Sequence, residues 1–230
     1  MIKLNKSGKL NFIIAMELAI LTIIFCAVAM TVDVRAVGPK NSLVGLASLN
    51  LAFHNNIGVN MTWYKITQVL GYLACLLVAV MAVIGLIQLI KRKSLLKVDK
   101  TILEAGCLYL VMFALYVIFE KLALNYRPII MPGETALEAS FPSSHTMLGI
   151  VVFGSIAMIA KDYIADVKIC RIVKIVMILL LIAIVVGRLL SGVHWMSDIV
   201  ASVLISATLL QLFHSFRVVI KDDNQIVSNK

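Results

Sequence analysis

Long apolar runs, separated by short polar stretches, extend over most of the chain. A helix that crosses about 30 Å of hydrocarbon needs roughly 20 mostly apolar residues, and each of these runs comes close to that length. The pattern predicts an all-α fold, an integral membrane bundle of six transmembrane helices that forms a single membrane domain (1–230). The expected spans are about 11–32, 66–90, 102–119, 143–160, 172–190 and 193–213.

Composition agrees with this pattern, because 61% of the 230 residues are hydrophobic and only 14% are charged. Together with a mean hydropathy of +1.01, these values lie well outside the range of soluble globular proteins. Lysines precede the first run, as they do in a secretion signal. That run is too long for a signal and lacks a small-residue cleavage site, so we expect it to be a retained helix.

Lysine and arginine are distributed unevenly across the expected membrane. With the N-terminus inside, fifteen of the 21 Lys and Arg residues fall in the inner segments, which are 1–10, 91–102, 161–174 and 214–230. Cytoplasmic loops hold such an excess, so we expect a multi-pass plasma-membrane protein with both termini in the cytoplasm. This topology also accounts for the net charge of +9, and we expect no nucleic-acid partner.

Cysteine and histidine positions indicate neither a disulfide framework nor a metal site. The four cysteines are scattered singly, without a CxxC pair or a His/Cys cluster, so we expect no bound metal and no other cofactor. His54 and His214 lack partners at ligand spacing, which favours structural or interfacial roles. Aromatic residues at the outer span ends are typical of interfacial anchors, namely Trp63, Tyr64 and Trp195.

Polar residues gather in three stretches that this topology places on the outer face. They are EKLALNYRP (120–128), FPSSH (141–145) and GRLLSGVHWMSD (187–198). An ionisable side chain within a membrane bundle is energetically expensive and indicates a function by default, whereas one at the end of a span also serves as an interfacial anchor. Each residue alone fits either interpretation, and the spacing favours the functional one.

The last stretch has the spacing of a histidine oriented by a carboxylate. His194 and Asp198 are four residues apart, so on a helix they share one face, and the carboxylate can accept a hydrogen bond from one imidazole nitrogen. The other nitrogen is then free to attack. A break at Ser191 and Gly192 lets Arg188 turn back toward the histidine, where its guanidinium can bind a phosphate or a carboxylate through two hydrogen bonds.

The FPSSH stretch fits the start of the fourth span. Pro142 is typical of a helix beginning, and Ser143 can cap the helix. The free amides of Ser143, Ser144 and His145 then form an anion site at the positive end of the helix dipole. An ordinary capped helix is the alternative. Likewise Arg127, which precedes a proline, is either a third anion-binding group or an interfacial arginine.

These motifs resemble those of the type 2 phosphatidic acid phosphatase superfamily, integral membrane lipid-phosphate phosphatases related to vanadium haloperoxidases. The signature of that family is K-x6-R-P, then P-S-G-H, then S-R-x5-H-x3-D. Its third motif is matched, with Gly187 in place of the usual serine, at Arg188, His194 and Asp198. Its second motif is matched, with Ser144 in place of glycine, at Pro142, Ser143 and His145.

The first motif departs from the family pattern. Arg127 and Pro128 match it, but the position of the lysine holds Glu120, and Lys121 comes one residue late. Two interpretations remain open. Either the long side chain of Lys121 reaches the site, or Glu120, which shares a helix face with Arg127, buffers that arginine instead of binding phosphate.

The resemblance implies a phosphohistidine mechanism without metal. His194 would attack the phosphorus atom, Asp198 would orient it, and His145 would protonate the leaving oxygen. The phosphate oxygens would be held by Arg127, Ser143, Ser144 and Arg188. These roles agree with the chemistry of the residues, because phosphoryl transfer depends mainly on positioning and on stabilisation of charge on the phosphate oxygens.

The expected function is hydrolysis of the phosphomonoester or diphosphate of a lipid at the outer membrane face. The substrate would be a polyprenyl diphosphate such as undecaprenyl diphosphate, phosphatidic acid or a similar lipid. One alternative is a non-catalytic binder or transporter of anionic lipids, and another is a phosphotransferase with an acceptor other than water. Glu17, inside the first span, has no role in this hypothesis, and the 33–65 segment would cover the outer face as a short lid.

Overall fold

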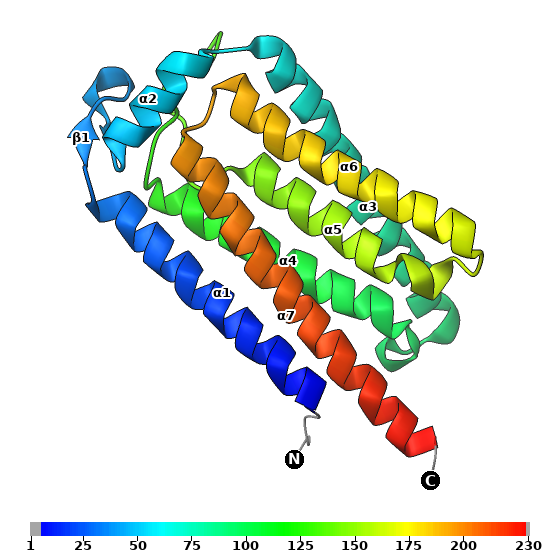
Figure 1. The fold of residues 1–230 in the computed structure, drawn as a ribbon. Coiled ribbons are helices and arrows are strands. Elements are labelled where there is room, and N and C mark those ends of the chain that lie inside the picture. The colour runs from blue at the N-terminus through cyan, green and yellow to red at the C-terminus, as the bar shows by residue number, and fades with distance from the viewer. Residues whose placement is uncertain (1–5, 229–230) are drawn as a thin grey trace.

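The computed structural model describes residues 6–228, with side chains for residues 8–218. Within this range six helices are long and apolar enough to cross a membrane, which confirms the predicted all-α bundle. They are α1 (Lys6–Thr31), α3 (Met61–Arg92), α4 (Lys100–Leu122), α5 (Ser144–Tyr163), α6 (Val167–Ser191) and α7 (Met196–Ser228). Figure 1 shows that α1 begins and α7 ends at the same end of the bundle. A short 3-10 helix, η2 (Leu95–Lys97), joins α3 to α4.

The central helix of the bundle is α5. It packs against α3, α4, α6 and α7, and it is the most deeply buried of the six spans. Val151, Val152 and Phe153 are fully buried in the main core cluster. Because neighbouring helices hold α5 on several sides, its first turn is a rigid support for the polar residues that lie there.

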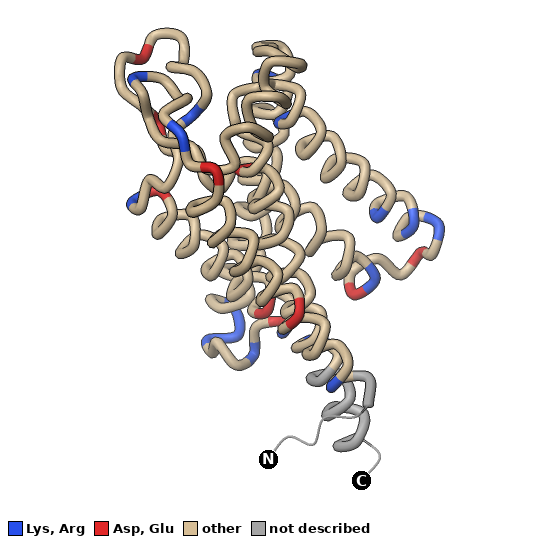
Figure 2. The backbone as a smooth tube through the Cα atoms, turned by 60° about the vertical axis from the view of Figure 1, so that its left-hand side comes forward, with Lys and Arg blue, Asp and Glu red and all other residues tan. Residues whose placement is uncertain are grey.

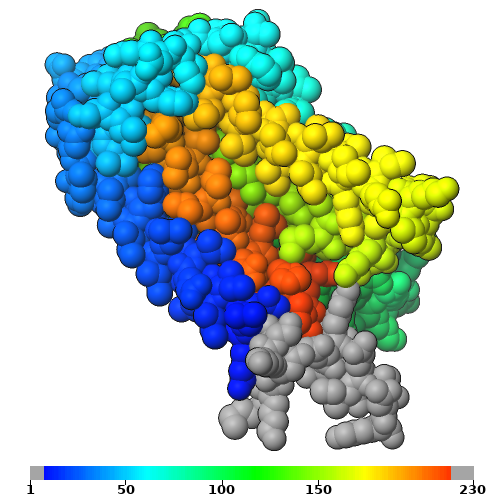
Figure 3. Space-filling model, in the orientation of Figure 1, coloured from blue at the N-terminus to red at the C-terminus, as the bar shows by residue number. Residues whose placement is uncertain are grey.

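Helix α1 packs along α7, so the first and the sixth spans are neighbours (Figure 1, Figure 3). The Oγ1 atoms of Thr22 and Thr208 are 3.0 Å apart, and Nε2 of Gln211 donates to the carbonyl of Asn11 over 3.2 Å. The remaining surface of α1 exposes large aliphatic side chains, as expected for contact with lipid. Glu17 lies on this exposed surface.

The segment before α3 is folded into a compact unit, where the sequence predicts only a lid. Residues 33–60, called the cap below, contain an antiparallel pair of strands, β1 (Arg35–Ala36) and β2 (Leu43–Val44), a 3-10 helix η1 (Pro39–Asn41) and α2 (Ala47–Ile57). The cap lies at the end of the bundle opposite the start of α1 (Figure 1). That end is called the cap end below.

Close contacts dock the cap on the turn between α6 and α7. The side chain of Asn50 is fully buried, its Nδ2 donates to Oγ of Ser197 over 2.9 Å, and its Oδ1 accepts from the Ser197 amide over 3.0 Å. As predicted, α6 ends at Ser191, and Gly192 adopts φ = +65°. A Cβ on Gly192 would lie 1.9 Å from the carbonyl oxygen of Gly58, so the approach of the cap requires glycine here.

Charged residues are concentrated toward the two ends of the bundle (Figure 2). At the end opposite the cap, Arg217 of α7 pairs with Glu104 of α4 and Asp162 of α5. Arg217 is only 6% exposed, so the two carboxylates compensate a cation that is nearly buried. This network connects three helices.

Candidate active site

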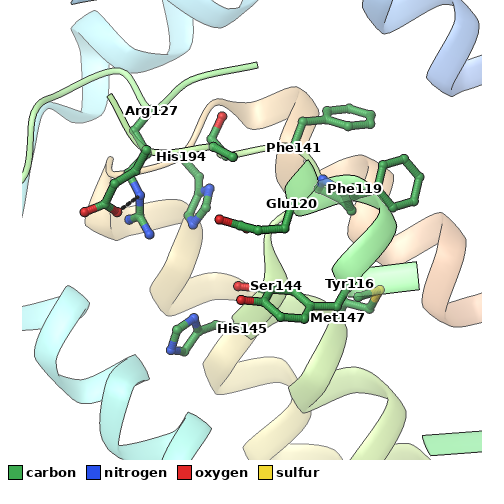
Figure 4. A pocket seen from close by; sticks show the side chains of 13 residues that line it. Tyr116, Phe119, Glu120, Arg127, Phe141, Ser144, His145, Met147 and His194 are labelled. Carbon is green, nitrogen blue, oxygen red and sulfur yellow. Dashed lines mark ion pairs between the residues drawn. The ribbon is translucent and has the colours of Figure 1, made fainter. Parts of the chain in front are cut away.

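A cavity of about 260 Å³ lies at the cap end of the bundle, between α4, the start of α5 and the loop that joins them. Side chains from all three polar stretches line it, among them Glu120, Arg127, Ser144, His145 and His194 (Figure 4). The fold therefore brings together residues that are far apart in the sequence. Among the described residues, no group of three or more His, Cys, Asp or Glu is arranged to hold a metal ion.

His194 lies in the turn between α6 and α7, beside Asp198 in the first turn of α7. Nδ1 of His194 is 3.6 Å from Oδ2 of Asp198. The carboxylate is fully buried, and it accepts hydrogen bonds from the Trp195 amide over 3.1 Å and from Nδ2 of Asn125 over 3.4 Å. Asp198 is thus fixed by its neighbours and faces one imidazole nitrogen, which leaves Nε2 available.

The surroundings of His194 keep its imidazole neutral. Burial is the largest cause that lowers the pKa of His194 well below its usual value, because it disfavours the charged form. The positive charges of Arg127 and Arg188 lower this pKa further, while the backbone of Ser140 acts in the opposite direction. Apart from this contact with the Ser140 backbone, neither ring nitrogen has a hydrogen-bond partner among the described residues. A neutral imidazole with a free nitrogen is the form that acts as a nucleophile.

Arg188 lies in the last turn of α6, is fully buried and is not among the residues that line the cavity. Its Nη2 donates to Oε1 of Gln68 over 2.7 Å, and its Cζ lies 5.1 Å from the ring centroid of Tyr64. Nε and Nη1 have no hydrogen-bond partner among the described residues. Because a buried guanidinium normally has its donors satisfied, these two N–H groups are available to a ligand that enters the site.

Arg127 comes from the loop after α4 and lines the cavity directly. Its Nε is 2.8 Å from Oε2 of Glu138, and its amide donates to the Glu138 carbonyl over 3.1 Å (Figure 4). Glu120 also lines the cavity, whereas Lys121 does not. The carboxylate that holds Arg127 therefore belongs to Glu138, a residue to which no sequence motif points, and not to Glu120.

The start of α5 differs from the prediction at Ser143. This residue occupies the N-cap position, but its hydroxyl caps no amide and accepts instead from Oγ1 of Thr146 over 3.0 Å. Its own amide donates to the Asp198 carbonyl over 3.2 Å, so the prediction that this amide is free for an anion was wrong. The amides of Ser144 and His145 belong to the first helical turn, which supplies no acceptor, and both residues line the cavity.

His145 packs against a glycine of α3. A Cβ on Gly71 would lie 2.7 Å from Cδ2 and 3.3 Å from Nε2 of His145, so only glycine leaves room for the imidazole at this place. Gly187, at the position where the family signature has serine, is equally confined. Its Cβ would lie 2.6 Å from Cγ2 of Thr67, so a serine here would collide with α3.

Several supporting residues were missed because their neighbours in space are distant in the sequence. Gln68 and Tyr64 hold Arg188, and nothing in the α3 sequence points to a buried arginine beside it. Trp195 was predicted to be an interfacial anchor, but it is 1% exposed and its Nε1 donates to the Tyr126 carbonyl over 2.8 Å. Its ring also lies 5.6 Å from that of His54, which agrees with a structural role for this histidine.

A second hollow of about 460 Å³ lies between α3 and α4, and its walls are almost entirely apolar. Met112 and Phe113 of α4 line it one turn before Tyr116, which lines the cavity. Leu148 of α5 lines it next to Met147, another residue of the cavity wall. On α4 and α5, residues that line this apolar hollow therefore lie close in sequence to residues that line the polar cavity.

The fold resembles that of a known protein, and the sequence matches the model of a known family. The crystal structure of the first transmembrane PAP2 type phosphatidylglycerolphosphate phosphatase from Bacillus subtilis resembles it with a TM-score of 0.62, over 88% of this chain and 95% of that chain. The two sequences are 18% identical, so this likeness concerns the fold alone. No curated protein matches the chain in sequence. The model of the PAP2 superfamily matches residues 72–221, more than half of the chain and all of its motif residues, and the chain therefore belongs to the PAP2 superfamily.

Proposed function

We propose that the protein is a membrane phosphatase that hydrolyses the phosphomonoester or diphosphate of a lipid through a phosphohistidine on His194. The main support is the buried imidazole of His194, with Asp198 beside one nitrogen and the unsatisfied donors of Arg188 nearby. Membership of the PAP2 superfamily supports the phosphatase chemistry. The apolar hollow between α3 and α4, which is lined on α4 and α5 by near neighbours of cavity residues, supports a substrate with a hydrocarbon chain.

In the first step of the proposed reaction, Nε2 of His194 forms a bond to phosphorus while the P–O bond to the lipid breaks. Asp198 stabilises the positive charge that develops on the imidazole. Protonated His145 gives its proton to the leaving oxygen. The phosphate oxygens are held by Arg127, Arg188 and the hydroxyl and amide of Ser144. Ser143 acts indirectly, because its amide ties the start of α5 to Asp198.

In the second step, a water molecule attacks the phosphohistidine. The oxygen of the water forms a bond to phosphorus, the N–P bond breaks, and His145 takes up the proton that the water loses. Inorganic phosphate then leaves, and both histidines return to their initial protonation states. Each step needs only the residues of this chain, the lipid and water.

The distribution of basic residues supports an orientation with the cap end outside and the termini in the cytoplasm. The substrate would then arrive laterally from the outer leaflet, and its hydrocarbon chain would lie in the apolar hollow between α3 and α4. Asn55 is exposed on α2 and Lys161 is exposed near the end of α5. We expect a membrane-impermeant maleimide to label Asn55→Cys on intact cells and Lys161→Cys only after lysis. The reverse pattern would contradict the orientation.

The catalytic proposal is tested by phosphate release from undecaprenyl diphosphate and phosphatidic acid by detergent-purified protein in the presence of EDTA. We expect release by the unaltered protein and none by His194→Asn or His145→Ala. His214→Asn, which changes a histidine of α7 outside the cavity, is the matched control and should retain full activity. Label from a radioactive phosphate should be trapped as an acid-labile adduct in the unaltered protein and not in His194→Asn.

Other outcomes would favour the alternatives. Binding of both lipids without release of phosphate by the unaltered protein would indicate a non-catalytic binder or transporter. Transfer of the label to an added alcohol, without inorganic phosphate, would indicate a phosphotransferase.

A further inference from the structure

The cavity contains a carboxylate where the family signature has a lysine. Glu120, in the last turn of α4, lines the cavity together with Arg127, His145 and His194, and its side chain points into it (Figure 4). A lysine at this position would add a positive charge to a phosphate site. Glu120 adds a negative charge instead, so the charge balance of this cavity differs from that of the signature.

The cations of the site do not neutralise Glu120. Arg127 is engaged by Glu138 at 2.8 Å, and Arg188 donates to Gln68. Glu120 itself has no ion pair or hydrogen bond among the described residues. Its carboxylate is therefore available to a group that enters the cavity with the substrate.

Charge complementarity then restricts the substrate. A phosphate bound beside His194 would meet the like charge of Glu120, and this repulsion disfavours a lipid whose only polar group is the phosphate. An ammonium group close to the phosphate would remove the repulsion and form a charge-assisted hydrogen bond with the carboxylate. The cavity of about 260 Å³ has room for such a group beside the phosphate, since a water molecule takes up only about 30 Å³.

We propose that Glu120 is a specificity-determining residue, which makes the site prefer lipid phosphates that carry a free ammonium group beside the phosphate. This preference presupposes the proposed phosphatase activity and names the substrate class of the same site. It also explains why the motif tolerates a reversed charge, because the ammonium of the substrate supplies the cation that the chain lacks at this position.

The test compares sphingosine 1-phosphate with its N-acetyl derivative, two probes that differ in whether the nitrogen is a free ammonium or an amide. We expect kcat/KM of the unaltered protein to be higher for the free amine by about tenfold, the ratio that one charge-assisted hydrogen bond supports. Glu120→Gln should remove most of this preference, and Glu120→Lys should reverse it. Glu134→Gln is the control, because it removes a carboxylate from an exposed residue outside the cavity. This variant should retain the preference for the free amine.

Two results would overturn the proposal while leaving the phosphatase function intact. One is equal kcat/KM of the unaltered protein for both probes. The other is an equal loss on both probes in Glu120→Gln, because this would assign Glu120 to a step common to both. If no phosphate is released from either probe, from phosphatidic acid or from undecaprenyl diphosphate, the phosphatase function itself is contradicted, and the substrate preference with it.

Discussion

Replacing Gly71 with alanine tests whether the position of His145 limits the reaction. The new Cβ would lie 2.7 Å from Cδ2 of His145, whereas carbon atoms in contact are about 3.5 Å or more apart. The imidazole must therefore move by about 1 Å, and a misplacement of that size lowers the rate of a catalysed step by about 100-fold. The side chains that bind the phosphate keep their places, so the change should appear in kcat more than in KM.

The assay measures kcat and KM for a lipid phosphate and for p-nitrophenyl phosphate. The nitrophenolate leaves without being protonated, so displacement of the acid His145 should slow the lipid reaction much more than the nitrophenyl reaction. Gly154→Ala is the matched control, because its Cβ would lie 2.6 Å from Cδ1 of Leu210, the end of a flexible side chain outside the cavity. We expect kcat of Gly154→Ala to stay close to that of the unaltered protein.

A Gly71→Ala protein with unchanged kcat for the lipid would refute this reasoning, because the imidazole would then have no positional role in the slow step. Equal losses for both leaving groups would show that the slow step is hydrolysis of the phosphohistidine, which is common to both substrates and in which His145 is the base, and would contradict a rate limit set by its role as the acid. Thermal unfolding in the same detergent distinguishes these results from a simple loss of folded protein.

Three further predictions concern pH dependence and stability. Burial and two arginines lower the pKa of His194, so its imidazole stays neutral as the pH falls through 6.5. The acidic limb of the pH profile of kcat/KM should therefore have its midpoint below that value. A midpoint at or above 6.5 would contradict the lowered pKa. Asn50→Ala removes both hydrogen bonds to the start of α7 and should lower the free energy of unfolding by about 2 kcal/mol. Asn56→Ala, on the exposed side of α2, is its control and should unfold like the unaltered protein in denaturant titrations. Arg217→Met removes the ion pairs with Glu104 and Asp162 and should destabilise the protein by about 2 kcal/mol, less than for a fully buried pair because both carboxylates keep some exposure; an unchanged unfolding midpoint would contradict this.

The parts of the structure that local sequence patterns determine were predictable. Six spans follow from the lengths of the apolar runs, because a helix is the simplest way to satisfy backbone hydrogen bonds in hydrocarbon. The proximity of His194 and Asp198 was predicted from their spacing of four residues, although His194 lies in the turn before α7 and not on the helix itself. Both signals lie within a few turns of helix, so they do not depend on how the helices pack.

Contacts between distant segments were not predictable in this way. The bonds of Asn50 to Ser197 and the fit of His145 against Gly71 exist only after the helices have packed. Ser143 shows the difference within one residue. Its place at the start of a helix is a local property and was predicted, whereas its amide is taken by the Asp198 carbonyl because α5 packs against α7.

The pairing of α1 with α7 has a consequence for biosynthesis. Helices enter the membrane in chain order, and four other spans lie between these two partners. Until α7 is inserted, the hydroxyl of Thr22 has only the carbonyl of Leu18 as an acceptor, at 2.7 Å within its own helix. The packing of α7 against α1 is thus the last event of assembly. It takes place when the turn before α7, which contains His194, also reaches its position. If synthesis stops before this point, the face of α1 that packs against α7 stays uncovered. The proteases that clear the membrane of incomplete proteins could then recognise it.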